Sequence, residues 1–446
     1  MKVCVVALGK IGLPLAVQFA QAGHDVIGAD ISQQAVDQIN NGIPPFPGEA
    51  GLTELLKTSI TNGSLLATTD TTGAVEQSEI VVVVVPLLVD ENAQPDFGPL
   101  DAATVDIAQG LRSGTLVSYE TTIPVHTTRQ RFGPALEKGS GLKAGTDFFL
   151  CHSPERVFSG RIFADLKAYP KLVGGINEAS TKKAIDFYES ALTFDERNDL
   201  EKPNGVWDLG SVEAAELAKL AETTYRDVNI GLANQFAIFA DGIDVDINKV
   251  IEACNTQPYS HIHRPGIAVG GHCIPVYPRF YLFNDPAATI PEAAREANQK
   301  MPSYAVGLLS DAINGISDAT ILILGAAYRG GVLETAFSGV FDLCEEVSNL
   351  GGIPVVHDPL YTDEQLLDLG LIPFDAAVHK PKGAILQADH SEYQHLDDSI
   401  LCGAKSIVDG RNWIISLPEG VQRITIGRGM KTGSNKEIPG AFGSQT

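Results

Sequence analysis

One cysteine follows two glycines in the stretch Val269-Gly270-Gly271-His272-Cys273-Ile274-Pro275. Two residues without side chains leave space beside a thiol and expose backbone N–H groups near it. A thiol in such surroundings can attack a carbonyl carbon and hold a substrate as a covalent intermediate. A lone cysteine is more often a small buried apolar residue, and His272 can equally be a structural imidazole. The pattern therefore makes Cys273 a candidate nucleophile and leaves the packing interpretation open.

Lys219 and Glu155 are candidates for proton transfer. Lys219 lies in a long stretch without proline, and Arg226 follows seven residues later on nearly the same helix face. A lysine that faces a cofactor can accept a hydroxyl proton, whereas a lysine on an outer helix face extends into solvent. Glu155 belongs to Ser153-Pro154-Glu155-Arg156, directly after an expected strand, where open α/β sheets place their ligands. It can activate a water molecule, or it can form a surface ion pair with Arg156.

A glycine-containing turn near the N-terminus has the spacing of a dinucleotide site. It reads Ala7-Leu8-Gly9-Lys10-Ile11-Gly12, with alanine where the G-x-G-x-x-G fingerprint begins. Gly9 lets the backbone approach a pyrophosphate, and Gly12 lets the following helix pack close to the strand. Asp30 stands at the end of the next expected strand, where a carboxylate binds a ribose 2′-hydroxyl and repels a 2′-phosphate. These residues predict NAD rather than NADP, and the alternative is a Rossmann-like fold without a ligand.

Strands and helices alternate so that these residues fall at strand ends. We expect strands at 3–8, 26–29, 80–85, 115–119 and 148–151 and a helix at 13–22. Continuous apolar runs are typical of parallel strands that are buried on both faces. A proline-free stretch at 211–241 predicts a helix about 45 Å long, which suits either a dimer surface or a core helix within one subunit.

The α/β pattern restarts after this helix, with expected strands at 319–324, 354–356, 384–386 and 406–408 and a helix at 339–350. The fold class we expect is α/β, with two Rossmann-like doubly wound domains joined by a long central helix. The expected boundaries are 1–205 for the NAD-binding domain, 206–301 for a central helical dimerisation and catalytic domain, 302–428 for the second Rossmann-like domain and 429–446 for a flexible tail.

The chain is acidic, because 55 Asp and Glu against 32 Lys and Arg give a formal net charge of −23. Phosphate backbones and anionic lipids select basic surfaces, so nucleic-acid and membrane partners are not expected. The longest apolar stretch is too short for a membrane helix, and no signal peptide is expected. Six cysteines without a CxxC pair are typical of a reducing compartment, which predicts a cytoplasmic protein.

The turn at 7–12 and the segments SPERVFSG, AELAKLAETTYRDVNIGLANQ and GGHCIPV resemble, in this order, the UDP-glucose/GDP-mannose dehydrogenase family over about residues 1–425. The last three look more like the branch that acts on UDP-N-acetylhexosamines. The resemblance implies oxidation of a primary alcohol to a carboxylate with two NAD per sugar, through a cysteine-bound intermediate. It implies a UDP-sugar substrate for the second Rossmann-like domain and a part in polysaccharide biosynthesis. The long helix at 211–241 predicts a homodimer, and no metal is expected. UDP-N-acetyl-D-mannosamine or another UDP-N-acetylhexosamine is the expected substrate, and UDP-glucose is the alternative.

The resemblance also implies residue roles, matched position by position. Cys273 corresponds to the nucleophile, Lys219 to the helix lysine, Glu155 to the water-activating glutamate and Thr122 to the threonine of an S-T-x-P segment. The expected cofactor-binding residues are Gly9, Lys10, Ile11, Gly12, Asp30, Pro86 and Thr122. The expected substrate-binding residues are Glu155, Arg156, Lys219, Arg226, Asn229, Arg264, Gly271 and Arg329.

Four positions depart from the family pattern. Tyr277 replaces an aspartate, Thr223 an asparagine, Ala336 a phosphate-binding arginine, and Ser159 an acid of the UDP-glucose branch. Three other functions stay open. They are a two-electron hydroxyacid dehydrogenase, which needs no Cys273, a non-catalytic protein that binds NAD or a sugar nucleotide, and a zinc alcohol dehydrogenase. The cysteine and histidine spacing matches no zinc pattern.

Overall fold

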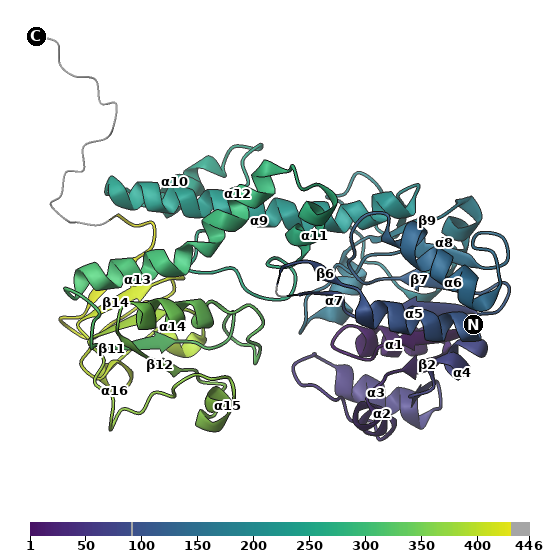
Figure 1. Ribbon diagram of the computed structural model, residues 1–446, viewed down its shortest axis with the longest axis horizontal. Helices are drawn as coiled ribbons and strands as arrows, with labels where there is room; N and C mark the ends of the chain where they lie inside the picture. The colour runs from purple at the N-terminus through teal and green to yellow at the C-terminus, as the bar shows by residue number, and fades with distance from the viewer. Residues whose placement is uncertain (91, 430–446) are drawn as a thin grey trace, which may run out of the picture. The chain divides into compact units, whose positions relative to one another are not determined.

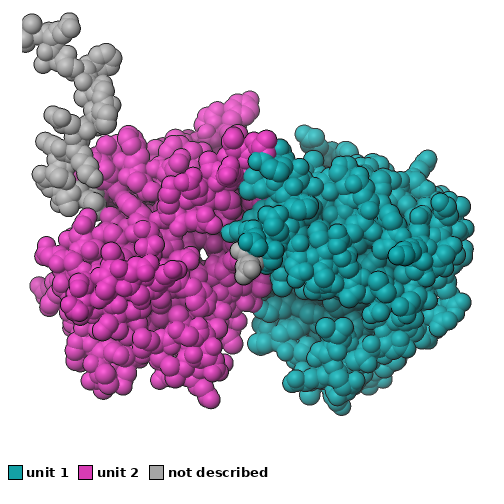
Figure 2. Space-filling view, viewed as in Figure 1, with its two compact units in different colours: residues 1–222, 279–286 teal, residues 223–278, 287–446 magenta. Residues whose placement is uncertain are grey.

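The computed structural model describes residues 1–90 and 92–429, which form two compact units (Figures 1 and 2). The first unit comprises residues 1–222 and 279–286, and the second comprises residues 223–278 and the chain from 287 onward. Of the expected flexible tail, residues 430–446 lie outside the described part of the chain.

The first unit is built on an eight-stranded sheet with the order β10-β9-β8-β7-β4-β1-β2-β3. All neighbours pair in parallel except β8 and β9, which pair antiparallel. The strands are β1 (Lys2–Val6), β2 (Asp25–Ala29), β3 (Leu65–Thr68), β4 (Ile80–Val83), β7 (Leu116–Tyr119), β8 (Phe149–His152), β9 (Lys171–Gly175) and β10 (Val206–Asp208). A separate ribbon consists of β5 (Leu88–Val89) and β6 (Pro95–Asp96).

Helices cover this sheet because their apolar faces need burial. They are α1 (Gly12–Gln21), α2 (Gln33–Asn40), α3 (Leu52–Thr61), α4 (Thr71–Glu76), α5 (Gly98–Gly110), the π-helical turn η1 (Thr128–Phe132), α6 (Gly133–Ser140), α7 (Ile162–Ala168) and α8 (Glu178–Ala191). Phe19 of α1 meets Phe187 of α8 edge to face, with ring centroids 5.2 Å apart. Val3 and Val5 of β1 belong to the same fully buried core, as expected for a central parallel strand.

The second unit has a five-stranded, entirely parallel sheet with the order β12-β11-β13-β14-β15. Its strands are β11 (Thr320–Leu324), β12 (Ile353–His357), β13 (Gly383–Leu386), β14 (Ser406–Asp409) and β15 (Gln422–Thr425). Its helices are α10 (Ile247–Cys254), α12 (Thr289–Gln299), α13 (Met301–Ala312), α14 (Gly339–Asn349), α15 (Asp363–Asp368), the 3-10 turn η2 (Ser391–Tyr393) and α16 (Asp398–Leu401). Both units contribute residues to α9 (Val212–Gly242) and α11 (Tyr277–Asn284).

The two parallel sheets and the 31-residue α9 confirm the predicted fold class. Among residues 1–90 and 92–429, no helix combines the length and the apolar character that crossing a bilayer requires.

Candidate functional site

The predicted site residues of the first unit follow five neighbouring strands. Glu155 comes after β8, Thr122 after β7, Pro86 after β4, the turn at 7–12 after β1 and Asp30 after β2. In the sheet these strands are adjacent and parallel, in the order β8-β7-β4-β1-β2. The carboxyl ends of parallel strands lie at one edge, so the sheet brings these residues to a single edge. Open α/β sheets bind their ligands at this edge.

The turn after β1 fits a dinucleotide. Gly12 packs so closely that an added Cβ would lie 1.9 Å from the carbonyl oxygen of Ala7. An added Cβ on Gly9 would meet no atom within 4 Å, so Gly9 leaves open space beside the N-terminus of α1. A helix N-terminus favours phosphate groups, and this space admits a pyrophosphate that a side chain would obstruct. Lys10 and Ile11 complete the turn, the first exposed and the second half-buried.

The Asp30 carboxylate is fixed against the same turn. Its Oδ2 atom accepts a hydrogen bond from the Leu8 N–H at 2.8 Å, and its Oδ1 atom accepts one from the Ser32 N–H at 2.9 Å. A carboxylate has about four acceptor positions, so two remain for ribose hydroxyl groups. The turn and this carboxylate together have the chemistry that NAD requires.

Glu216 connects the segment after β7 to α9. It is fully buried, and its two oxygens accept the backbone N–H groups of His126 at 2.7 Å and Thr128 at 2.8 Å. Burial raises the pKa of Glu216 to about 7. Thr122 precedes this anchored segment, and Lys219 lies about one turn further along α9; both are buried. The sequence analysis did not identify Glu216, although this residue lies three positions before Lys219 in the segment AELAKLAETTYRDVNIGLANQ.

Glu155 does not form the surface ion pair that was the alternative to water activation. Its Oε1 atom accepts the backbone N–H groups of Arg156 and Val157, at 2.5 and 2.7 Å. The Arg156 guanidinium instead pairs with Glu222 of α9, with Nε 3.2 Å from Oε2, and donates to the Pro170 carbonyl at 3.1 Å. The Glu155 carboxylate is therefore oriented by backbone groups.

In the second unit, the glycines before Cys273 allow close backbone packing. A Cβ added to Gly270 would lie 2.6 Å from Cβ of Tyr328 and 2.8 Å from the carbonyl oxygen of Phe337. Gly271 has a φ of 89° and donates its N–H to the Ala336 carbonyl at 2.8 Å. Cys273 is exposed. The two glycines thus seat the loop on the segment that follows β11 and leave the thiol at the surface.

Arg411 is a second anchor of the Cys273 loop, which the sequence analysis did not identify. It follows β14 and donates hydrogen bonds to the carbonyl oxygens of Gln387 at 2.6 Å, Ala268 at 3.2 Å and Tyr328 at 3.2 Å. The Ile267 N–H also donates to the Gly410 carbonyl at 3.0 Å. Burial lowers the pKa of Arg411. The loop that carries Cys273 is therefore held by side-chain and backbone bonds within its own unit.

Three other predicted substrate-binding residues have partners in the second unit. The Asn229 amide bonds the segment before Arg264, through the His263 N–H at 2.9 Å and the His261 carbonyl at 2.8 Å. Arg264 pairs with Glu252 of α10 at 3.0 Å. Arg329 is exposed, and its Nε atom lies 3.2 Å from the Tyr328 hydroxyl. Arg226 is likewise exposed.

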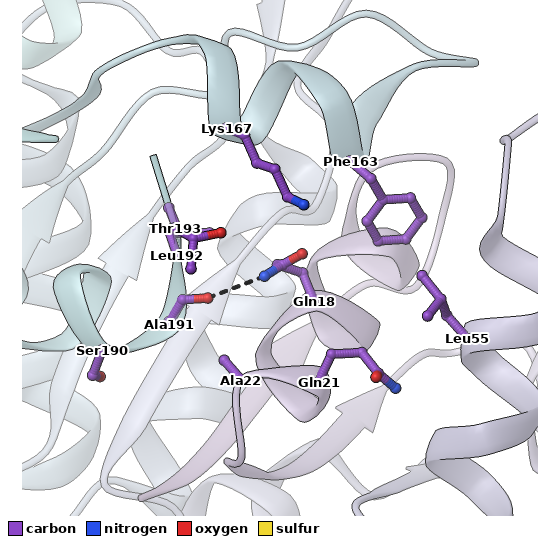
Figure 3. A pocket seen from close by; sticks show the side chains of 10 residues that line it. All are labelled: Gln18, Gln21, Ala22, Leu55, Phe163, Lys167, Ser190, Ala191, Leu192 and Thr193. Atoms are coloured by element: carbon purple, nitrogen blue, oxygen red, sulfur yellow. Dashed lines mark hydrogen bonds between the residues drawn. The ribbon is translucent and has the colours of Figure 1, made fainter. Parts of the chain in front are cut away.

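A pocket of about 430 Å³ lies elsewhere in the first unit (Figure 3). It is found at the C-terminal ends of α1 and α8, whereas the dinucleotide turn precedes the N-terminal end of α1. Gln18 donates a hydrogen bond to the Ala191 carbonyl on its wall at 3.4 Å. The lining contains none of the predicted site residues. It consists of Gln18, Gln21, Ala22, Leu55, Phe163, Lys167, Ser190, Ala191, Leu192 and Thr193.

Three models of one family match successive parts of the chain. They are described as the NAD binding domain, the central domain and the UDP binding domain of the UDP-glucose/GDP-mannose dehydrogenase family, and they match residues 1–192, 213–300 and 322–416. The first description confirms NAD as the expected cofactor. Together the three matches confirm the resemblance noted from the sequence and identify the chain as a dehydrogenase.

Individual proteins match over nearly the whole chain. The UDP-N-acetyl-D-mannosamine dehydrogenase of Pyrococcus horikoshii is 34% identical over 441 residues, which cover 96% of this chain and 100% of that protein. The NDP-N-acetyl-D-galactosaminuronic acid dehydrogenase of Ralstonia nicotianae is 30% identical over an alignment that covers 92% of this chain and 95% of that protein.

Solved structures agree with these matches. The UDP-D-ManNAc dehydrogenase of Pyrococcus horikoshii superposes with a TM-score of 0.85 at 33% identity, over 96% of this chain and 99% of that one. The UDP-N-acetyl-mannosamine dehydrogenase of Staphylococcus aureus superposes with a TM-score of 0.82 at 30% identity, over 96% and 99%. On this evidence the chain belongs to the UDP-glucose/GDP-mannose dehydrogenase family.

Proposed function

We propose that the chain catalyses the NAD-dependent four-electron oxidation of the primary alcohol of a UDP-N-acetylhexosamine to a uronate. UDP-N-acetyl-D-mannosamine is the first candidate substrate. The observation that carries this proposal is the 34% identity, over 96% of the chain, to a protein named UDP-N-acetyl-D-mannosamine dehydrogenase. The relative that is named an NDP-N-acetyl-D-galactosaminuronic acid dehydrogenase supports another N-acetylhexosamine as the second candidate.

Lys219, Thr122 and Cys273 are proposed to act in the two oxidation steps. Bound NAD supplies the hydride acceptor for each oxidation. Lys219, directly or through a water molecule, takes the proton of the primary hydroxyl group as the aldehyde forms. Thr122 belongs to the proposed catalytic and cofactor sites. The Cys273 thiol then adds to the aldehyde carbon, and its proton passes to the carbonyl oxygen. The resulting thiohemiacetal becomes a thioester when its carbon loses a second hydride and its hydroxyl group loses a proton to solvent.

Glu155 is proposed to complete the reaction by hydrolysis. It takes a proton from a water molecule whose oxygen forms a bond to the thioester carbonyl carbon. The C–S bond breaks and its electron pair returns to the Cys273 sulfur, which releases the uronate. The support from the structure is the orientation of Glu155, since two backbone N–H groups occupy its Oε1 atom.

The binding residues proposed from the resemblance divide into two sets. For NAD they are Gly9, Lys10, Ile11, Gly12, Asp30, Pro86 and Thr122. For the UDP-sugar they are Glu155, Arg156, Lys219, Arg226, Asn229, Arg264, Gly271 and Arg329. Tyr277, Thr223 and Ala336 stand where other members carry an acid, an amide and an arginine, so the sugar and diphosphate contacts here are proposed to differ from theirs.

We also propose the boundaries 1–205, 206–301 and 302–428 for the NAD-binding, central and UDP-sugar-binding domains; the three family matches fall inside them.

A homodimer through α9 is proposed because this helix exposes apolar side chains, among them Tyr225, Leu232, Phe236 and Phe239. A cytoplasmic location is proposed because all six cysteines are free. A part in polysaccharide biosynthesis is proposed from the family resemblance.

A panel of UDP- and GDP-sugars with NAD tests the function. We expect two NADH per UDP-N-acetylhexosamine, measured by absorbance, and a product mass that corresponds to the uronate.

Cys273→Ser should abolish net four-electron oxidation and leave NAD and sugar-nucleotide binding nearly unchanged, because a serine hydroxyl is a poor nucleophile without an adjacent base. Glu155→Gln should accumulate a thioester on Cys273, visible in the intact mass. Two NADH per sugar from Cys273→Ala protein would refute the mechanism.

A further inference from the structure

A buried polar network lies in the first unit next to Glu155. Glu120 directly follows β7, and its side chain is fully buried. Its Oε2 atom accepts a hydrogen bond from Nζ of Lys171 at 2.6 Å, and its Oε1 atom accepts one from the Tyr188 hydroxyl at 2.6 Å. The Tyr188 hydroxyl also lies 2.8 Å from the hydroxyl oxygen of Ser118. Both oxygens of Glu120 therefore have fixed donors.

Lys171 is the cation of this network. It begins β9, is buried, and holds its Nζ atom 4.9 Å from the centre of the Tyr188 ring. Burial raises the pKa of Glu120, and the Lys171 charge opposes that effect. Removing two ions from water costs as much as their attraction returns, unless both are well hydrogen-bonded. A buried ion pair is therefore weak evidence for a purely stabilising role, and the groups around it indicate what else it does.

The nearest further group is the Glu155 carboxylate. Its Oε2 atom lies 4.0 Å from Nζ of Lys171. This oxygen is buried and has no hydrogen-bond partner among the described residues, whereas Oε1 has two. A cavity of about 20 Å³ is lined by both Glu155 and Lys171. A volume of roughly 10–15 Å³ is enough for one water molecule when two or more polar groups face it.

We propose that Lys171, held by Glu120, is a positioning residue for Glu155 in thioester hydrolysis. One ammonium N–H bonds Glu120, and another reaches the Glu155 Oε2 atom through a water molecule in the cavity. The bridge orients the second carboxylate oxygen, so that Glu155 is held in one position when it takes the proton of the attacking water. The bridging water is not consumed. This inference rests on the proposed function, since it assigns Lys171 to the step that Glu155 performs.

Lys171→Met tests the proposal, because the change removes the charge and preserves most of the side-chain volume. The enzyme is mixed with NAD and the sugar nucleotide in a single turnover, and the intact protein mass is followed after rapid quenching. We expect the thioester to form at nearly the wild-type rate and to hydrolyse about tenfold to hundredfold more slowly. Lys171→Arg retains the cation and should restore most of the hydrolysis rate. Lys182→Met removes a charge from the exposed face of α8 and should leave both rates unchanged.

Two results would overturn the proposal: hydrolysis by Lys171→Met at the wild-type rate, or equal slowing of thioester formation and hydrolysis, which a purely structural role produces. If Lys171→Met does not fold, Glu120→Gln serves instead, because it leaves the lysine in place without its carboxylate anchor. It should slow hydrolysis selectively, and unchanged hydrolysis would overturn the proposal equally.

Glu155→Gln and Lys171→Met together separate the hydrolysis mechanism from the role of Lys171. If Glu155→Gln accumulates no thioester, the proposed hydrolysis mechanism is wrong whatever Lys171 does. If Glu155→Gln accumulates it and Lys171→Met does not, only the role of Lys171 is wrong. The double variant should hydrolyse no more slowly than Glu155→Gln, because Lys171 acts through Glu155.

Discussion

Gly9 and Gly12 lie in one turn, yet an added methyl group meets different surroundings at each. At Gly12 it would overlap the Ala7 carbonyl oxygen, and at Gly9 it would enter open space. Gly12→Ala should therefore destabilise the protein by about 1–3 kcal/mol, the usual range for overpacking. Gly9→Ala should change stability by less than about 0.5 kcal/mol and weaken NAD binding at least about tenfold. Thermal unfolding and an NAD titration measure both; wild-type NAD affinity in Gly9→Ala would contradict the assignment of the open space to the pyrophosphate.

Asp30 determines the cofactor in our interpretation. Asp30→Ala should weaken NAD binding selectively and relax discrimination against NADP, since the carboxylate that repels a 2′-phosphate is lost. The same change removes the hydrogen bonds to the Leu8 and Ser32 N–H groups. Asp30→Asn is the matched control, because it removes the charge and keeps one acceptor oxygen. Kinetics with NAD and NADP decide the question, and efficient use of NADP by the wild type would disprove the ribose role.

Functional residues could be identified from the sequence where their residue types and their spacing along the chain form a local motif. Gly9, Gly12 and Asp30 lie within one strand–turn–helix–strand unit, so their partners are local. Lys171 and Glu120 are 51 positions apart, and only the pairing of strands makes them neighbours. Arg411 bonds Ala268 across 143 positions. No local pattern marks such residues, because their importance comes from burial and long-range contact.

Helix α9 gives the protein a pH dependence that can be measured. The pKa of Glu216 is raised by burial from 4.5 to about 7, so the folded state binds this proton more tightly than the unfolded chain does. The contribution of Glu216 to stability must therefore fall as the pH rises from about 4.5 to about 7, by roughly 3 kcal/mol at about 1.4 kcal/mol per pKa unit.

Urea unfolding of the wild type and Glu216→Gln between pH 4.5 and 8 tests this effect. The difference in unfolding free energy between the two proteins isolates Glu216, because the other groups titrate alike in both. We expect the wild type to lose stability relative to the variant up to about pH 7 and no further above it. A difference that stays constant across the range would show that Glu216 does not titrate there.

The sequence analysis predicted nine of the fifteen strands found in residues 1–90 and 92–429, and three of the helices. The strand expected at 3–8 ends at Val6, because Ala7 turns the chain with a φ of 75° in the left-handed region. Strand β9 (Lys171–Gly175) was not predicted from the sequence. It has five residues, KLVGG, and glycine has low strand propensity.

At the scale of the whole molecule, the outer face of α9 leads to a prediction about assembly. Phe239 is 61% exposed, and Leu232 and Phe236 are exposed on the same helix. If this surface joins two copies, Phe236→Glu should yield monomers or insoluble protein, because the interface would then bury an unpaired charge. Light scattering measures the mass. Val105→Glu changes an exposed apolar residue of α5 and should leave the assembly unaltered; a monomeric wild type would refute the dimer.

The family could be identified from sequence because its motifs are spaced over nearly the whole chain, and the three family matches confirm it. The sugar substrate could not be identified from the sequence. Substrate choice depends on side chains from distant segments, and Tyr277, Thr223 and Ala336 depart from the pattern at such positions. The panel of nucleotide sugars addresses this point directly.

The native cysteines make the protein its own unfolding reporter. Cys4 and Cys151, in β1 and β8 of the first unit, are fully buried, and burial raises the pKa of both thiols to about 12. These thiols have almost no thiolate at neutral pH, so an alkylating reagent reaches them only when the surrounding sheet opens. Exposed Cys273 is modified without any opening. Timed alkylation followed by peptide mapping therefore reports the opening of the first unit's sheet, with no engineered label.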